Sequence, residues 1–598
     1  MVPAEQYLAP KEQEPTHVSQ SDGLPSPRVL VMHRLAARLS RLARPAKGFV
    51  SQPEPRTIGS FARGRQLVAG NFQFAGRLVE AKGVPIWDLA TGDGRFDDEI
   101  HGFRWLDDLA AVSDGPARER AQAWTFGWID RYGTGKGPGW LPELTGRRLI
   151  RWVNHAIFLL NGQSPAATRA FFRSLGRQTR FLSQRWRAAP AGLPRIEALT
   201  GLIYAGLSLT GLERYVAPAS AALARECRDR VDAEGGIPSR NPEELLEVLT
   251  LLTWAASALS GSGRAPERDH LAAIARIAPT LRALRQADGG LARFHGGERG
   301  LDGWLDQALA EAHALSGGKA LTAHGLAMGY GRLSAGRTTV VIDAGAPPKG
   351  AASKSAHAST LAFEMTSGRR PVIVNCGSGA AFGAEWHRAG RATPSHSTLG
   401  IRGVSSSRLR GDAAGAVMVT APDQVWAQTD SGHDGQRLLA GHNGYAGEFG
   451  LTHVRQLSLS VDGRMLAGED TLGAMTAIDR RRFEVALEAS RMAGVPFDIR
   501  FHLHPDVDSA LDLGGTAVSL ALKSGEIWVF RHDGTAELAL EPSVYLQAGR
   551  LKPRPARQIV LSAVVLDYAC QIGWTLAKAH DTPAAIRDTG RDDDPADD

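Results

Sequence analysis

Histidine and asparagine side chains flank two apolar segments between residues 355 and 400. Leu, Phe and Met recur at period two within 361–365, and residues 372–374 form a continuous Val-Ile-Val run. Two such runs separated by a glycine-containing turn predict a β-hairpin. His357 precedes the first strand, Asn375 ends the second and His396 begins the next segment. These side chains at adjacent strand ends suit a divalent metal such as Zn²⁺, and the alternative is three hydrogen-bonded polar residues.

The sequence around these three residues resembles the C-terminal domain of heparinase II/III-like polysaccharide lyases. The resemblance is carried by HASTLAFE from His357, VIVNCG through Asn375 and RATPSHSTL through His396. It continues in segments such as HNGY, GLTHVR, GED and FHLHP, at 442–445, 450–455, 468–470 and 501–505. Upstream, residues 192–211 and 235–249 resemble the helical domain of the family, so the resemblance spans about residues 60–575.

This resemblance implies a fold, an activity and a cofactor. The fold is an incomplete α/α toroid followed by an antiparallel β-sandwich. The activity is β-elimination beside a uronic acid of an acidic polysaccharide. That step needs a group to neutralise the uronate carboxylate, a base for the C5 proton and an acid for the departing oxygen. The cofactor is one Zn²⁺ held by His357, Asn375 and His396.

Several positions depart from the family pattern. Asn375 stands where an aspartate is usual, and a neutral amide is a weaker zinc ligand than a carboxylate. Ser355 stands where active members often carry a catalytic histidine. Glu244 and Leu245 occupy the places of a tyrosine–histidine pair, and residues 192–194 lack the carboxylate-holding asparagine.

Other residues are predicted to substitute for the missing groups. We expect Tyr445 beside His442 to supply a phenol near the cleft, and Arg240 or Arg391 to pair with the uronate carboxylate. The predicted substrate-binding residues on the helical side are Asn154, His155, His295 and Glu244.

Each of these residues also has a structural alternative. His442 and Tyr445 are also explained by a turn and a buried tyrosine whose hydroxyl finds a partner. Asn241-Pro242 reads as the N-cap and first residue of a helix, which leaves Arg240 as a contact to that helix start. Two functions therefore stay open: a lyase acting on an acidic glycan, or a catalytically altered member that binds glycan or a membrane surface.

Composition sets broad limits on function. The 598 residues favour two or three domains, and the net charge of +6 fits a polyanionic glycan, an anionic membrane or nucleic acid equally well. The three cysteines, Cys227, Cys376 and Cys570, are too far apart in sequence for a clustered metal site. The glycine-rich stretches lack the strand-turn-helix context of a phosphate loop, and we expect no nucleic-acid partner.

Periodicity and composition predict four segments. Residues 1–57 comprise a polar stretch, a basic amphipathic helix over 28–44 and a proline-rich linker. That helix is predicted either to lie on an anionic bilayer or to dock on the protein itself. Residues 58–325 are helical, 326–575 form the sandwich and 576–598 an acidic tail.

The elements themselves are indicated by apolar spacing. Leu149, Ile150, Val153 and Ile157 form one helical stripe, and residues 338–343 are the first clear strand. The expected location is open as well. The family implies the periplasm or cell envelope, whereas the first residues lack the pattern of an export signal and so indicate the cytoplasm.

Overall fold

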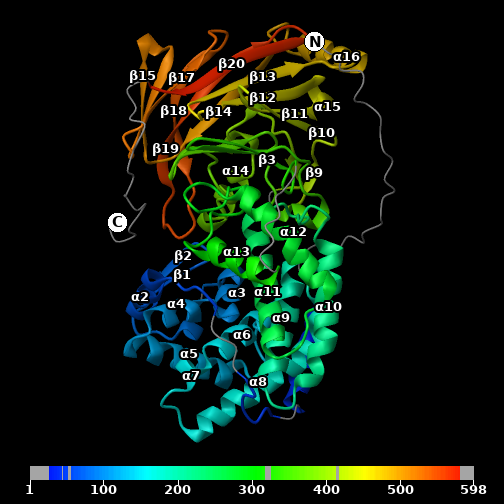
Figure 1. Ribbon diagram of the computed structural model, residues 1–598, viewed down its shortest axis with the longest axis vertical. Coiled ribbons are helices and arrows are strands. Elements are labelled where there is room, and N and C mark those ends of the chain that lie inside the picture. The colour runs from blue at the N-terminus through cyan, green and yellow to red at the C-terminus, as the bar shows by residue number, and fades with distance from the viewer. Residues whose placement is uncertain are drawn as a thin grey trace.

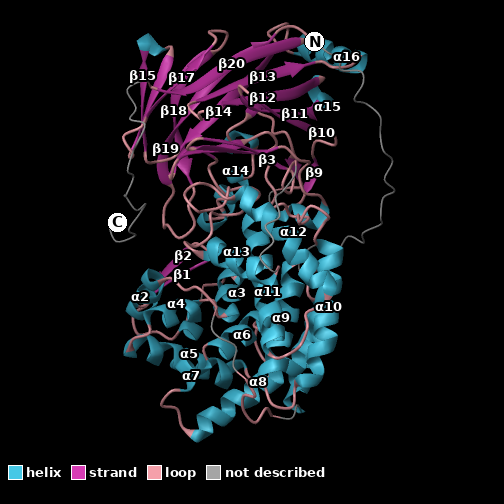
Figure 2. Ribbon diagram, viewed as in Figure 1, coloured by secondary structure: helices cyan, strands magenta, loops and turns pink. Residues whose placement is uncertain are grey.

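A computed structural model describes residues 26–42, 45–51, 56–89, 91–316, 325–411 and 416–579. Helices fill the lower half of the molecule and strands the upper half (Figure 1; Figure 2). The predicted order of a helical domain and then an antiparallel β-sandwich is therefore confirmed. The predictions for residues 1–25 and 580–598 lie outside the described residues.

The lower half consists of helices joined by glycine- and proline-containing turns. Their first turns are capped by short polar side chains, as at Ser60, Asp114 and Asn241. The helices of this half after the N-terminal one are α2 (Phe61–Ala69), α3 (Gly94–Gly102), α4 (Trp105–Val112), α5 (Gly115–Tyr132), α6 (Pro142–Asn154), α7 (Ala156–Leu160), α8 (Pro165–Arg185), α9 (Leu193–Ser208), α10 (Val216–Arg230), α11 (Pro242–Gly261), α12 (Arg268–Leu284) and α13 (Trp304–Leu315).

Aromatic side chains fill the core of the helical half. Phe103 and Trp105 have ring centroids 4.6 Å apart, and Trp128 and Trp152 meet edge to face at 5.6 Å. All four are at most 1% exposed. Large rings that interlock in this way bury much apolar area per side chain, so the helices that carry them are held firmly.

A short β-hairpin interrupts the helical half and was not predicted. Strands β1 (Asn71–Phe74) and β2 (Arg77–Glu80) pair antiparallel around a turn at Ala75 and Gly76. Gly76 has a φ of +76°, and a Cβ there would lie 1.6 Å from the carbonyl oxygen of Ala381. This turn therefore touches a loop of the upper half, which only a residue without a side chain allows.

Two large antiparallel sheets form the upper half. Their strand orders are β10-β11-β12-β13-β20-β17-β16-β15 and β18-β19-β14-β6-β5-β4-β3, with β7 added beside β14. The bounds are β3 (Tyr330–Ala335), β4 (Thr338–Asp343), β5 (Phe363–Ser367), β6 (Arg370–Val374), β7 (Leu399–Ile401), β10 (Val425–Gly432), β11 (Gly435–Tyr445), β12 (Leu451–Ser460), β13 (Met465–Gly473), β14 (Val495–Leu503), β15 (Val507–Asp512), β16 (Ala517–Leu522), β17 (Ile527–His532), β18 (Glu537–Tyr545), β19 (Arg554–Val565) and β20 (Ala569–Lys578).

Smaller elements complete the upper half: strands β8 (Arg408–Leu409) and β9 (Met418–Thr420), and helices α14 (Ala384–Gly390), α15 (Ala446–Phe449) and α16 (Ala477–Ala489). The predicted hairpin is confirmed as β5 and β6, with Gly368 at a φ of +55° between them. Phe363 stacks on Trp574 at 5.8 Å, and Phe501 meets the same indole edge to face at 4.7 Å, so inward-facing residues of both sheets share one core.

The N-terminal helix α1 (Pro27–Leu39) docks on α8 through its small residues. Ala36 and Ala37 are buried, and buried His33 accepts a hydrogen bond from Arg185 at 3.1 Å. The apolar residues that predicted this helix point outward instead: Val31, Met32, Leu35, Leu39 and Leu42 are all 48% exposed or more. Among the described residues, no helix is long and apolar enough to span a bilayer.

Candidate functional site

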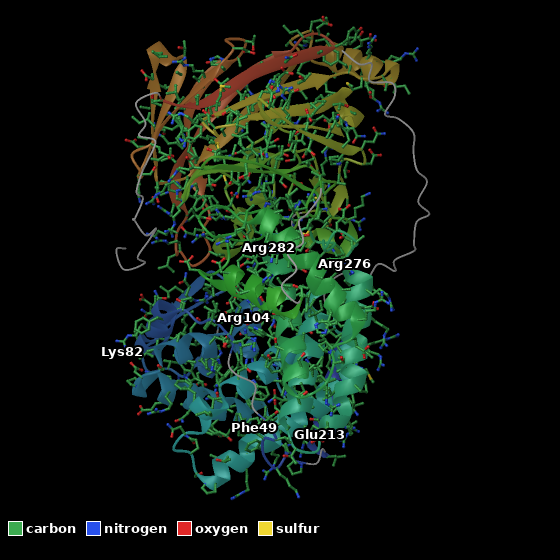
Figure 3. The ribbon with its side chains drawn as sticks, viewed as in Figure 1. Phe49, Lys82, Arg104, Glu213, Arg276 and Arg282 are labelled. Carbon is green, nitrogen blue, oxygen red and sulfur yellow. The ribbon has the colours of Figure 1, made fainter. Side chains whose placement is uncertain are left out.

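A cleft of about 600 Å³ opens where the helical half faces the sandwich. Most of its lining comes from helices α3, α4, α6, α9, α11 and α13, and from the β1–β2 turn. The loops at 378–381 and 548–549 close the side toward the sandwich. Figure 3 labels Arg104 near α3, on the side of the helical half that faces the sandwich. A cleft of this size and position is where the fold can hold a ligand.

Charged and aromatic side chains dominate the cleft. Trp105, Trp254 and Trp304 contribute indole rings. Six arginines and seven carboxylates also line it: Arg56, Arg63, Arg95, Arg104, Arg147 and Arg151, with Glu99, Asp107, Asp108, Glu197, Glu247, Glu298 and Glu311. Guanidinium groups can bind carboxylates, and of the three indoles only that of Trp304 is partly exposed, whereas Trp105 and Trp254 are buried.

Every arginine of the lining already has a carboxylate partner. Three of these pairs are short: Arg104 contacts Glu247 at 2.5 Å, Arg151 contacts Asp107 at 2.9 Å, and Arg147 pairs with Glu197. The other three contacts are longer. They are 3.4 Å from Arg56 to Glu311, 3.6 Å from Arg63 to Asp108 and 3.9 Å from Arg95 to Asp93.

Two neighbouring carboxylates of the cleft differ in their ionisation. Burial raises the pKa of Asp108 to about 6, against the lowering effect of Arg63 and of a hydrogen bond from the Ser60 N–H. Burial acts on Asp107 in the same direction, yet Arg151 and His155 outweigh it and lower its pKa. Adjacent groups whose environments separate their pKa values form a candidate acid and base pair.

His155, one of the predicted substrate-binding residues, contacts the lining of the cleft. Its Nε2 is 2.9 Å from Oδ1 of Asp107 and 3.1 Å from the hydroxyl of Thr57, and both partners line the cleft. Asn154 is buried at the end of α6, and neither atom of its amide has a hydrogen-bond partner. Glu244 lies in the first turn of α11, where burial raises its pKa.

Arg240 and His295 instead join the two halves of the molecule. Arg240 donates to Asp343 at 2.6 Å and to the carbonyls of Met328, Gly329, Gly345 and Ala346 at 3.0–3.1 Å. The Nε2 of His295 lies 3.4 Å from the other carboxylate oxygen of Asp343. All three nitrogens of this guanidinium donate to protein acceptors. Arg240 is therefore a junction residue between the two halves, and the geometry does not favour it as the predicted ligand of a uronate carboxylate.

The predicted metal ligands do come together, but only the two histidines have ring nitrogens that no hydrogen bond occupies. The rings of His357 and His396 are 5.1 Å apart, and neither nitrogen of either ring has a partner. Asn375 differs, because its amide oxygen accepts from the N–H of Ser397 at 3.0 Å and its nitrogen donates to Glu364. Among the described residues, no group of three or more His, Cys, Asp or Glu could hold a metal ion.

The remaining predicted catalytic residues are inside the sandwich. Tyr445 is 1% exposed and donates to the carbonyl of Leu399 at 3.2 Å. Buried His442 lies 3.3 Å from His453, which contacts Asp470 at 2.7 Å. Arg391 is also buried, donates to the carbonyls of Ala356 and Ser353, and has its pKa lowered to about 10 by burial. None of these residues lines the cleft.

Sequence reasoning missed the charged residues that do line the cleft. Arg147 and Arg151 are four residues apart on α6, a spacing that places both on one face of a helix. Asp107 and Asp108 form an acidic pair within an otherwise apolar helix, α4. These patterns are visible in the sequence, but they do not indicate a cleft until the positions of the neighbouring helices are known.

The two halves have counterparts in known proteins. Residues 318–575 match the family described as Heparinase II/III-like, C-terminal. FtsZ-localized protein C of Caulobacter vibrioides (strain NA1000 / CB15N) is 32% identical over 555 residues, which are 92% of this chain and 92% of that protein.

Solved structures extend the likeness in fold to the helical half. A crystal structure of heparinase III matches with a TM-score of 0.65 and 12% identity, over 92% of this chain and 89% of that one. Heparan sulfate lyase HepC from Pedobacter heparinus matches with a TM-score of 0.52 and 14% identity, over 92% and 87% of the two chains. By its family match and by its similarity along nearly the whole length of that relative, this chain belongs to the heparinase II/III-like family.

Proposed function

We propose that the chain binds a uronate-containing acidic glycan in the cleft between its two halves. The observation that carries this proposal is the lining itself, in which six arginines accompany the partly exposed indole of Trp304. Guanidinium groups suit uronate carboxylates, and this indole offers apolar surface for the face of a sugar ring. Membership of a family that includes polysaccharide lyases supports the same ligand class.

Cleavage of that glycan by β-elimination is the more specific form of the proposal. Among the described residues that line the cleft there is no histidine or tyrosine to move the protons. The lining group best suited to exchange a proton near neutral pH is Asp108, whose pKa is about 6, beside the ionised Asp107. Binding without cleavage is the reading that the lining favours.

One experiment separates the two forms. The purified protein is incubated with a panel of uronate-containing glycans while absorbance in the unsaturated-uronate band is followed, and binding is measured in parallel by calorimetry. Binding with flat absorbance supports a glycan-binding protein, and rising absorbance that is abolished in Asp108→Asn supports a lyase. The glycan proposal fails if no member of the panel binds.

A second candidate function is attachment to an anionic membrane surface together with FtsZ. The relative with 32% identity is named for its localization with FtsZ. The exposed stripe of α1 and of the 3-10 turn that follows it (Ser40–Leu42) consists of Val31, Met32, Leu35, Leu39 and Leu42. It is favoured as a surface for an anionic bilayer because arginines 34, 38 and 41 lie beside it.

Vesicle sedimentation tests this second function. The full chain is expected to sediment with vesicles that contain anionic lipid, and the double variant Leu35→Glu, Leu39→Glu to stay in solution. Val485→Glu is the matched control, since Val485 is an exposed apolar residue on α16. Equal sedimentation of all three proteins, or a fluorescent fusion that does not co-localise with labelled FtsZ, would remove it.

The pair His357 and His396 carries a separate proposal, that of metal binding. Four ring nitrogens without partners fit two ligands of a divalent ion such as Zn²⁺, while the amide of Asn375 is already hydrogen-bonded and fits poorly as a third. Elemental analysis of the purified protein is the test. Metal that is lost in His357→Ala and His396→Ala and kept in His433→Ala supports the site, and metal content that is unchanged by both variants removes it.

A further inference from the structure

One side of α8 carries a row of arginines. Arg169, Arg173, Arg177 and Arg180 fall within about 80° of one another on a helix of 3.6 residues per turn, and they extend over about 17 Å. Arg177 is half-buried and the other three are exposed. The chain has no Asp or Glu from residue 144 to residue 196, so α8 brings no carboxylate of its own. Figure 1 shows α8 at the end of the helical half that lies away from the sandwich.

A fifth arginine joins this row from the N-terminal segment. The 3-10 turn Ser40–Leu42 packs on α8 and carries exposed Arg41. Burial lowers the pKa of Arg177, the charges of Arg173 and Arg41 lower it further, and no described carboxylate acts on it. We call these five residues, arginines 41, 169, 173, 177 and 180, the basic face.

The charge of the basic face is not neutralised within the described part of the chain. No ion pair there joins Arg41, Arg169 or Arg173 to a carboxylate. Arg177 donates to the carbonyl of Gly133 at 3.2 Å, while its buried Nε has no hydrogen-bond partner. Like charges held together in this way repel one another, and a bound anion would relieve that repulsion.

The basic face and the apolar stripe of α1 point in different directions. Around α1, arginines 34, 38 and 41 lie between the buried side, which packs on α8 through Ala37, and the apolar stripe. Because Arg41 lies beside the arginines of α8, the stripe is on the flank of α1 that is farther from them. A bilayer that takes up the stripe therefore leaves the basic face uncovered.

The side chains of the basic face suit a carboxylate-rich protein segment. All five are guanidinium groups, whose planar fork binds a carboxylate through two parallel hydrogen bonds. Phe171, Phe172 and Phe181 of α8 are buried, so they offer no ring on which nucleic-acid bases could stack. An extended chain advances about 3.3 Å per residue, so five or six residues of such a segment cover the row.

We propose that the basic face binds an extended acidic segment of a partner protein. Its carboxylates pair with exposed Arg41, Arg169 and Arg173, and they supply the counter-charge that is missing around Arg177. Helix α8 contributes no residue to the lining of the cleft. A partner bound at the basic face therefore leaves both the cleft and the apolar stripe open, and this surface is independent of the two functions proposed above.

Fluorescence anisotropy with a labelled decaglutamate peptide tests the proposal on the full chain. We expect saturable binding that is at least tenfold weaker in the double variant Arg169→Gln, Arg173→Gln. The matched control is Arg225→Gln with Arg481→Gln, because these arginines are exposed on α10 and α16 and the change in net charge is the same. The control should bind within about twofold of the wild type. No binding of decaglutamate, or equal weakening in both double variants, overturns the proposal.

The class of partner is tested with two other polyanions at the same concentration of negative charge. The probes are phosphatidylglycerol vesicles and a short duplex DNA. Decaglutamate is expected to be the probe whose binding depends most on Arg169 and Arg173. Vesicles or DNA that bind more tightly than decaglutamate, and lose that binding in the Arg169→Gln, Arg173→Gln variant, would assign the basic face to a lipid surface or a nucleic acid and overturn the proposal.

The unneutralised charge is tested without any ligand. Arg173→Gln removes one of the charges that act on Arg177, so we expect it to raise the midpoint of thermal unfolding of the free protein. Arg225→Gln is expected to leave the midpoint unchanged. A midpoint that falls in Arg173→Gln would mean that this arginine stabilises the fold through its own contacts, and it would contradict the charge cluster on which the proposal rests.

Discussion

At the scale of single residues, an arginine predicted to bind the substrate is instead engaged in a buried ion pair between the two halves of the molecule. Arg240, predicted as a substrate ligand, donates its hydrogen bonds to Asp343 and to backbone carbonyls of the sandwich. Its ring partner Tyr330 lies 4.7 Å from the guanidinium and donates to the carbonyl of Arg240. The sequence shows that an arginine precedes a helix start, but the partners are about 90 to 105 residues away and no local pattern names them.

We predict that Arg240→Ala lowers the free energy of unfolding by about 3–5 kcal/mol, because it leaves the carboxylate of Asp343 buried without a counter-charge. Arg240→Lys is expected to recover little of this loss, since an ammonium lacks the planar fork. Urea unfolding measures both. Arg65→Ala is the control: its pair with Asp114 is exposed, so the loss stays below about 1 kcal/mol. Equal losses at positions 65 and 240 would contradict the junction role.

The buried imidazoles of His442 and His453 give a prediction about pH. Burial lowers the pKa of both, with Arg455 adding to the effect and Asp470 opposing it at His453. The unfolded chain then binds more protons than the folded one below about pH 6.5, so stability is complete above that pH and falls as the pH falls.

For each such histidine the slope of the unfolding free energy against pH approaches at most about 1.4 kcal/mol per pH unit below pH 6.5. We expect His442→Gln to reduce the slope of the unfolding free energy against pH across this interval. His433→Gln, at an exposed position, should leave the slope unchanged. A slope that does not change in His442→Gln would show that His442 is not the neutral, buried group described here.

At the scale of elements, local sequence patterns predicted the secondary structure correctly where capping and periodicity alone determine it. Asn241 caps α11, as the Asn-Pro pair predicted, by accepting from the N–H groups of Glu243 and Glu244 at 2.9 Å and 3.1 Å. The predicted apolar stripe through Leu149 and Val153 is wrong at its last residue, Ile157. Helix α6 stops at Asn154, and Ile157 on the next short helix is 74% exposed.

We predict that Asn241→Ala destabilises the protein by about 1 kcal/mol through loss of the cap. Asn241→Asp retains the acceptor for the two N–H groups but loses the bond from the amide nitrogen to the carbonyl of His295. Thermal unfolding of the two variants separates these contributions. We expect the aspartate variant to be more stable than the alanine variant. The opposite order would show that the hydrogen bond to His295 contributes more to stability than the cap does.

The N-terminal helix shows why an apolar stripe does not by itself predict burial. Its periodic apolar residues are exposed, and its alanines pack on α8, because small side chains let two helices approach closely. Amphipathic spacing identified the helix and its two faces. Which face meets the protein depends on the shape of α8, and that information lies more than a hundred residues further along the chain.

At the scale of the whole molecule, the order of domains was predictable and the position of the cleft was not. The change from helical to strand periodicity near residue 330 marks the boundary in the sequence itself. The cleft, by contrast, draws residues from positions between 56 and 549. The catalytic and metal-binding residues predicted from the family motifs lie at the junction of the two halves and inside the sandwich. The charged residues of the cleft come together only through the packing of helices that are distant in sequence.

The most direct test is a calorimetric titration of an unsulfated uronate oligosaccharide into the wild-type chain and into a cleft variant, Trp304→Ala with Arg63→Gln, in which both altered side chains are at least partly exposed. The variant Trp386→Ala, on α14 and outside the cleft, serves as the control. We predict saturable binding to the wild type and the control, and at least a tenfold weaker affinity in the cleft variant. Binding of equal strength to all three proteins would contradict the claim that this cleft is the glycan site.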